Sequence, residues 1–114
     1  MLNHYTPSLD PIFHALADGA RRHMLSRLTQ GPAPVSELAA PLPMSLPAVL
    51  QHLKVLEQAG LVQSRKQGRV RLCEACPEPL SAAAEWIADR RAFWDSALDR
   101  LDRFLDETPK EQDP

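Results

Sequence analysis

The spacing of apolar residues changes at Gly60, and this change limits the folds that the chain can adopt. Ser45 can cap a helix that runs to Ala59, and Gly60 can end it. Within that helix, a spacing of three to four residues predicts a buried stripe of Leu46, Val49, Leu53 and Leu56. After Gly60 the period falls to two, and Gln67-Gly68 can form a tight turn between two strands over residues 61–72. The sequence therefore predicts a capped helix followed directly by a β-hairpin.

Shorter helices are predicted before this helix. Asp10 can cap a first helix, and Asp18 can cap a second one that ends at Gly31. A short helix is expected over residues 35–40, because prolines follow it. We interpret the run Arg21-Arg22-His23 as an exposed, solvated face of the second helix. Together these elements predict a mainly α fold with a small β-hairpin.

A long helix is predicted over residues 80–105, after two prolines. Its apolar residues keep a near-heptad spacing. About 26 residues extend about 39 Å, which is more than so small a body can cover. The surplus apolar face predicts a partner, most simply a second copy of the chain; the alternative is a helix folded back on its own chain. We assign the dimer interface to Ile12, Phe13, Leu16, Ile87, Trp94, Leu98, Leu101 and Leu105.

The length of 114 residues fits one domain. We expect this domain over residues 9–106, between an N-terminal arm of residues 1–8 and a disordered tail of residues 107–114. No segment has the roughly 18 apolar residues of a membrane span. The polar N-terminal segment also lacks the apolar run of a signal peptide. We therefore expect a cytoplasmic protein without membrane contact.

The charge of the chain is distributed unevenly. The whole chain carries a formal net charge of −2, which by itself argues against a uniformly basic nucleic-acid binder. Residues 45–72, however, hold five basic side chains against Glu57 alone. Salt screens charges beyond about 8 Å, so the electric field of a protein is local. A positive segment therefore indicates a polyanionic partner better than the net charge of the whole chain does.

Four segments of the chain carry motifs of a known family: residues 15–22, residues 36–39, residues 45–62 and Gln67-Gly68-Arg69. They resemble the ArsR family of bacterial transcriptional repressors. Residues 15–22, ALADGARR, resemble the opening motif of the family, and residues 36–39 resemble its first helix-turn-helix (HTH) helix. Residues 45–62, SLPAVLQHLKVLEQAGLV, are similar to its recognition segment, the most specific of these signals. Gln67-Gly68-Arg69 match its wing turn. The resemblance covers about residues 9–106 and implies a winged helix-turn-helix with a long C-terminal dimerisation helix.

The resemblance implies a homodimeric repressor that binds a palindromic DNA operator through the helix 45–59 and the wing 61–72. An α-helix fits the major groove, where a glutamine can pair bidentately with adenine. The expected recognition residues are Ser45, Leu46, Pro47, Ala48, Gln51, His52 and Lys54, and the expected wing residues are Arg65, Lys66, Arg69 and Arg71. Arg69 and Arg71 share one strand face by alternation, so we expect them to act together. The alternatives are a purely capping role for Ser45, a packing role for His52 and a solvated strand face for the wing.

Two leucines depart from the family pattern. Leu50 stands where the family usually has a small polar residue, and Leu46 stands where a polar residue is frequent. Among the base edges, a leucine can contact only the methyl group of thymine.

The regulatory ligand is not evident from the sequence. Many relatives sense metals, but both metal sites that the resemblance would imply lack their ligands here, so we expect no metal and no cofactor. Cys73 and Cys76 form a C-x-x-C pair that could act as a thiol switch or bind a soft metal. Two incidental cysteines are the simpler interpretation, and an unknown small-molecule inducer is a further candidate.

Two other classes of function compete with DNA binding. A protein-interaction module on the same scaffold is compatible with the acidic C-terminal segment, but the basic hairpin argues against it. An enzyme is disfavoured, because the sequence holds no phosphate-binding glycine motif and no nucleophilic or paired-carboxylate set with suitable spacing.

Overall fold

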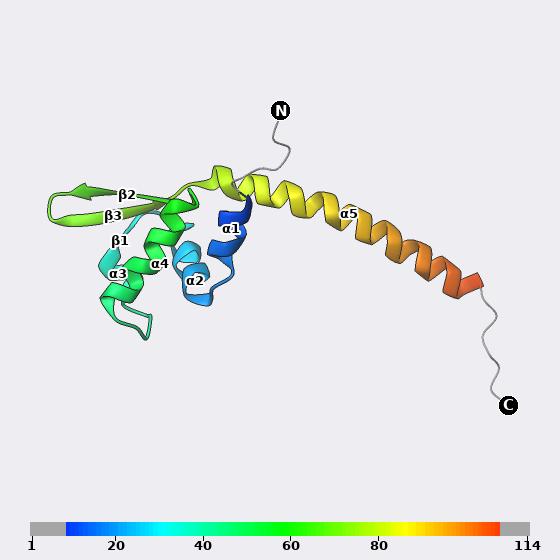
Figure 1. Ribbon diagram of the computed structural model, residues 1–114, viewed down its shortest axis with the longest axis horizontal. Coiled ribbons are helices and arrows are strands. Elements are labelled where there is room, and N and C mark those ends of the chain that lie inside the picture. Colours follow the sequence, from blue (N-terminus) through cyan, green and yellow to red (C-terminus); the bar gives the residue numbers. More distant parts are fainter. Residues whose placement is uncertain (1–8, 108–114) are drawn as a thin grey trace. The chain divides into compact units, whose positions relative to one another are not determined.

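The structure is a computed structural model that describes residues 9–107. The elements follow in the order α1 (Leu9–Leu16), α2 (Gly19–Leu28), β1 (Ala33–Pro34), α3 (Val35–Ala39), α4 (Leu46–Gln58), β2 (Val62–Gln67), β3 (Val70–Ala75) and α5 (Pro77–Glu107) (Figure 1). The predicted arm, and the predicted tail apart from Glu107, lie outside the described residues. The chain divides into two units, residues 1–83 and residues 84–114. The predicted fold class, mainly α with a small antiparallel sheet and a long C-terminal helix, is confirmed.

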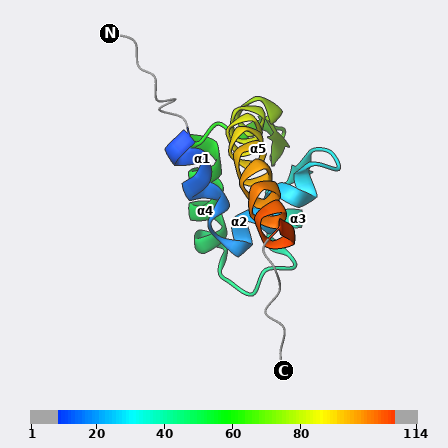
Figure 2. The same ribbon diagram turned by 90° about the vertical axis from the view of Figure 1, so that its right-hand side faces the viewer.

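Helices α1, α2 and α4 pack together around one apolar core (Figure 2). Ile12, Met24 and Leu53 contribute one fully buried side chain from each of these helices. Burial of a side chain of this size stabilises the folded chain by about 1.5–3 kcal/mol. Leu38 of α3 and Ala83, in the second turn of α5, extend the same core. Ile12 is therefore a core residue of a single chain, and its expected place in a dimer interface is wrong.

Side chains cap two of the helices as predicted. Asp18 Oδ1 accepts hydrogen bonds from the backbone N–H groups of Ala20, at 2.8 Å, and Arg21, at 3.2 Å. The bond from Arg21 is the main reason that the pKa of Asp18 lies below its ordinary value. Ser45 Oγ accepts from the backbone N–H of Ala48 at 3.3 Å. Asp10, in contrast, lies inside the first turn of α1, because that helix begins at Leu9, two residues before the predicted first helical residue Pro11.

The sheet has three antiparallel strands in the order β1-β3-β2. Gln67 pairs with Val70, so the turn residues are Gly68 and Arg69, one position later than predicted. Gly68 takes a φ of +68°, which glycine adopts without the strain that a Cβ would add. The hairpin extends to Ala75 rather than to residue 72. The short strand β1, which pairs with β3, was not predicted.

Helix α5 runs from Pro77 to Glu107, over 31 residues. It begins three residues before its predicted start, because a proline at the first helical position sacrifices no intrahelical hydrogen bond. The apolar residues Trp94, Leu98 and Leu101 are exposed along it, at 61%, 57% and 52%. None of the helices in residues 9–107 is long and apolar enough to cross a membrane.

Candidate DNA interface

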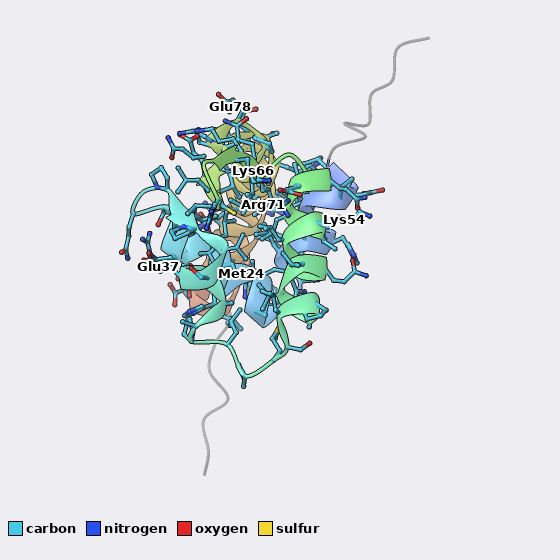
Figure 3. All side chains as sticks on the ribbon, turned by 90° about the vertical axis from the view of Figure 1, so that its left-hand side faces the viewer. Met24, Glu37, Lys54, Lys66, Arg71 and Glu78 are labelled. Carbon is cyan, nitrogen blue, oxygen red and sulfur yellow. The ribbon has the colours of Figure 1, made fainter. Side chains whose placement is uncertain are left out.

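Helix α4 is held by one face and leaves the other face open. Val49, Leu53 and Leu56 are fully buried, whereas Leu46 is 53% exposed. The predicted stripe is thus correct for three positions and wrong for Leu46, which lies in the first turn, outside the core. Figure 3 shows Lys54 extending from α4, away from the labelled core residue Met24.

The open face of α4 carries most of the predicted recognition residues. An open hollow of about 510 Å³ is lined by Pro47, Leu50, Gln51, Lys54, Glu57 and Arg71, so it joins α4 to the hairpin. Ser45 is exposed, and Ala48 and His52 are half-buried. The cap uses the oxygen of Ser45 as an acceptor, which leaves its hydroxyl hydrogen available to donate. A capping role and a phosphate contact for Ser45 are therefore compatible.

An ion pair fixes α3 to α2. Arg27 donates from Nε and Nη2 to one oxygen of Glu37, at 2.9 and 2.6 Å. A third bond from Arg27 Nη1 reaches the carbonyl oxygen of Gly31 at 3.1 Å. These bonds hold the first HTH helix against the helix that precedes it.

The four basic residues of the hairpin fall into two groups. Arg65 pairs with Glu74 at 3.1 Å, and Arg71 pairs with Glu57 of α4 at 2.8 Å. The side chains of Lys66 and Arg69 make no hydrogen bond or ion pair within the described part of the chain, and neither does the side chain of Lys54. The unpaired positive charge of this face therefore belongs to Lys54, Lys66 and Arg69.

Arg71 connects the hairpin to α4. Its Nε donates to Ser64 Oγ at 3.0 Å, and its Nη2 donates to Glu57 Oε2. Ser64 Oγ also donates to the same carboxylate oxygen. Arg69 lies in the turn, so strand alternation does not place it on one strand face with Arg71 as predicted. Both side chains nevertheless line one open hollow of about 400 Å³ at the hairpin, and their joint action stays a prediction. Arg71 thus fixes the hairpin to α4, whereas the side chain of Arg69 makes no hydrogen bond or ion pair among the described residues.

Arg21 is a structural residue that the sequence analysis missed. It is only 9% exposed, so its expected place on a solvated face is wrong. Its guanidinium donates to the carbonyl oxygens of Ala15 and His14, at 2.8 and 3.0 Å, and lies 3.0 Å from His52 Nδ1. The signal was available, because residues 21, 24, 25 and 28 have the spacing of one buried helical face. Arg21 therefore fastens the end of α1 to the recognition helix.

The contact with Arg21 assigns the tautomer of neutral His52. A guanidinium can only donate, so Nδ1 of His52 accepts and the ring hydrogen lies on Nε2. Asp18 Oδ1 is 3.9 Å from the same Nδ1. His52 thus packs against α2 through one nitrogen and retains a donor on the other.

The cysteines are poorly suited to a thiol switch. Cys73 is fully buried on β3, and Cys76 is half-buried. Burial is the main cause that raises the pKa of both thiols, which disfavours the reactive thiolate. Residues 9–107 hold no group of three or more His, Cys, Asp or Glu side chains that could bind a metal ion.

The other predicted interface residues differ in their exposure. Phe13 and Leu16 of α1 are half-buried against the core, so only part of each side chain can meet a partner. Ile87 and Leu105 are 49% and 55% exposed, which leaves them available for a second chain.

The helical pair α3–α4, the hairpin that follows it and the unpaired cations of α4 and the wing define a winged helix-turn-helix DNA-binding protein. Three comparisons agree with this class. A family of proteins described as "Helix-turn-helix domain" matches residues 16–65. The HTH-type transcriptional regulator Rv2034 of Mycobacterium tuberculosis is 44% identical over 99 residues, which cover 87% of this chain and 90% of the relative.

Two solved structures extend the comparison. The crystal structure of the ArsR family transcriptional regulator RHA00566 has 45% identity and a TM-score of 0.76, covering 83% of this chain and 98% of that one. The solution structure of Mb0332 from Mycobacterium bovis, described as a homodimeric winged helix-turn-helix DNA-binding domain, has 28% identity and a TM-score of 0.60. It covers 75% of this chain and 82% of that one. The chain belongs to the ArsR family, and it is a DNA-binding transcriptional regulator rather than an enzyme.

Proposed function

We propose that this regulator is a homodimeric repressor that binds a palindromic operator. The observation that carries the proposal is the face of α4 and the wing, where Lys54, Lys66 and Arg69 are charged and unpaired among the described residues. Such cations bind phosphates in a sequence-independent way, while the exposed side chains of α4 meet base edges in the major groove. Gln51, exposed on α4, is the candidate to pair with adenine.

The dimer part of the proposal rests on α5. Trp94, Leu98, Leu101 and Leu105 repeat with the alternating four- and three-residue spacing of a helix seam and are all more than half exposed. A monomer would leave this apolar seam in water, and a second copy of the chain would cover it. The relative from Mycobacterium bovis is described as a homodimer, which supports the same arrangement here. A two-fold symmetric protein requires an operator with two inverted half-sites.

The proposal is tested by footprinting the whole chain on the DNA upstream of its own gene and transcribing the same template in vitro. A repressor is expected to protect two inverted half-sites, centred about 34 Å apart or a multiple of this distance, and to reduce the transcript. Protection without symmetry would contradict the dimeric operator. A transcript that increases when the protein is bound would contradict repression.

A further inference from the structure

Two large apolar side chains are exposed on the recognition helix. Leu46 is 53% exposed and Leu50 is 36% exposed, although leucines on the other side of α4 are fully buried. Residues four apart lie one above the other on a helix, so Leu46, Leu50 and Lys54 form one ridge. Leu50 also lines the hollow that α4 shares with the wing. We call Leu46 and Leu50 the apolar ridge.

The surroundings of the apolar ridge indicate what covers it. Lys54 continues the ridge without a partner among the described residues, and Gln51 lies beside Leu50 in the same hollow. Arg71 lines this hollow and also a second open hollow of about 400 Å³, whose lining includes the unpaired cations Lys66 and Arg69 of the wing. A partner that covers the ridge must therefore combine a strong negative charge with an apolar group at its surface.

The major groove of DNA meets this requirement. The thymine methyl group is the apolar feature of its base edges, and phosphates border the groove on both sides. Adenine offers the two groups that a glutamine amide pairs with, and adenine is always opposite thymine. The apolar ridge and Gln51 therefore favour the same base pair.

We propose that Leu46 and Leu50 determine specificity by contacting thymine methyl groups, so that α4 selects A·T base pairs. This inference rests on the proposed operator binding. It adds Leu50 to the predicted recognition residues, and it specifies that Leu46 contacts the methyl group of thymine. A methyl group buried against such a side chain contributes about a fourfold gain in affinity.

The test begins with the whole chain and a library of random DNA duplexes. Duplexes that the protein binds are selected and amplified over several rounds, which identifies a preferred duplex. The thymines of that duplex are then replaced by uracil, one position at a time in both half-sites. Uracil keeps every hydrogen-bonding group of thymine and lacks only the methyl group. At a contacted position we expect a loss of about fourfold per half-site, or about sixteenfold for the symmetric duplex.

Variants assign the effect to the ridge. Leu50→Ala is expected to bind the thymine duplex more weakly and to lose little further affinity with uracil at its contact. Gln58→Ala, which changes an exposed residue in the last turn of the same helix, should retain the full uracil effect. Thermal unfolding of both variants checks that the fold is intact, because Leu50 lies outside the core.

The possible failures are distinguishable. If no preferred duplex emerges from the library, sequence-specific operator binding itself is contradicted. If a duplex is selected but uracil and thymine bind the wild-type chain equally at every position, only the reading of thymine is overturned. If Leu46→Ala and Leu50→Ala both bind the selected duplex as tightly as the wild-type chain does, the apolar ridge makes no contribution to DNA binding and the proposal is overturned.

Discussion

The guanidinium of Arg21 lies 3.0 Å from Nδ1 of His52, and this contact joins α2 to the recognition helix α4. The same side chain donates to two carbonyl oxygens at the end of α1, so one buried cation connects three helices. Hydrogen bonds that involve a charged group contribute about 1.5–3 kcal/mol each, and loss of the cation would leave their acceptors unpaired.

Replacing Arg21 is therefore expected to destabilise the fold. We expect Arg21→Ala to lower the free energy of unfolding by about 2–3 kcal/mol, measured by urea denaturation. The matched control is Arg22→Ala, which removes one exposed hydrogen bond to the carbonyl oxygen of Leu16 and should cost about 0.5 kcal/mol or less. If the two variants lost the same free energy of unfolding, the contacts of the Arg21 side chain with α1 and α4 would contribute nothing to stability.

The lowered pKa of Asp18 predicts a pH dependence of stability. Because the folded-state pKa lies below the unfolded value of about 3.9, the contribution of this carboxylate is complete above that value and is lost as the pH falls through the folded-state pKa. The difference in Tm between the wild-type chain and Asp18→Ala should therefore narrow when thermal melts are repeated at pH 3 and below. Asp10→Ala changes an aspartate that caps no helix and should show a smaller difference at every pH. A gap for Asp18→Ala that stays constant down to pH 2 would contradict the capping role.

The pairing of the wing cations predicts different effects on DNA binding. Arg69→Ala and Lys66→Ala are each expected to reduce the salt dependence of binding by about one phosphate contact per protomer, because neither cation is neutralised within the described chain. Arg65→Ala should change this slope less, because Glu74 already balances its charge. Arg71→Ala should also leave the slope closer to wild type but weaken binding by releasing the wing from Glu57. Anisotropy titrations over a range of salt concentrations measure the slope of log affinity against log salt for all four variants. Equal slopes would contradict the division of the wing into paired and unpaired cations.

The raised pKa values of the thiols predict slow cysteine chemistry. At pH 8, Cys76 of the folded protein should react with Ellman's reagent more slowly than glutathione does, because less of it is thiolate. Cys73 should react only after unfolding, since it is fully buried. The wild-type chain could lose DNA binding on mild oxidation while the double variant Cys73→Ser with Cys76→Ser keeps it. That result would contradict this prediction and support a thiol switch.

The exposed seam of α5 predicts a loss of dimers when it is made polar. Leu98→Asp with Leu101→Asp should shift the protein from dimer to monomer in sedimentation equilibrium, because two carboxylates would have to be buried at the interface. Asp99→Ala lies between them on the same helix and serves as the control. A monomeric wild-type chain would contradict the proposed assembly.

The sequence predicted those elements whose signals are local. The caps at Asp18 and Ser45 depend on side chains within three residues, and the hairpin depends on alternation beside a glycine turn. Strand β1 escaped prediction because its two residues become a strand only by pairing with β3, about 40 residues later in the chain. Sequence periodicity could not show this contact.

The sequence predicted where the elements of the candidate site lie along the chain, but not which of its charged side chains form ion pairs. The helix over residues 45–59 and the hairpin after it were predicted close to their observed positions, yet the partners of Arg71 and Arg65 depend on how α4 and the two strands pack. Ile12 was assigned to a dimer because an apolar side chain looks the same in a core and in an interface. Its complete burial within one chain decides between the two.

The central claim, that the face of α4 and the wing binds DNA as a dimer, is tested most directly by one titration. Fluorescence anisotropy of the whole chain on DNA from upstream of its own gene would be measured from 50 to 300 mM salt. Three unpaired cations in each of two protomers predict a slope of log affinity against log salt of about −5. A slope near zero, or no binding at the lowest salt, would contradict the account.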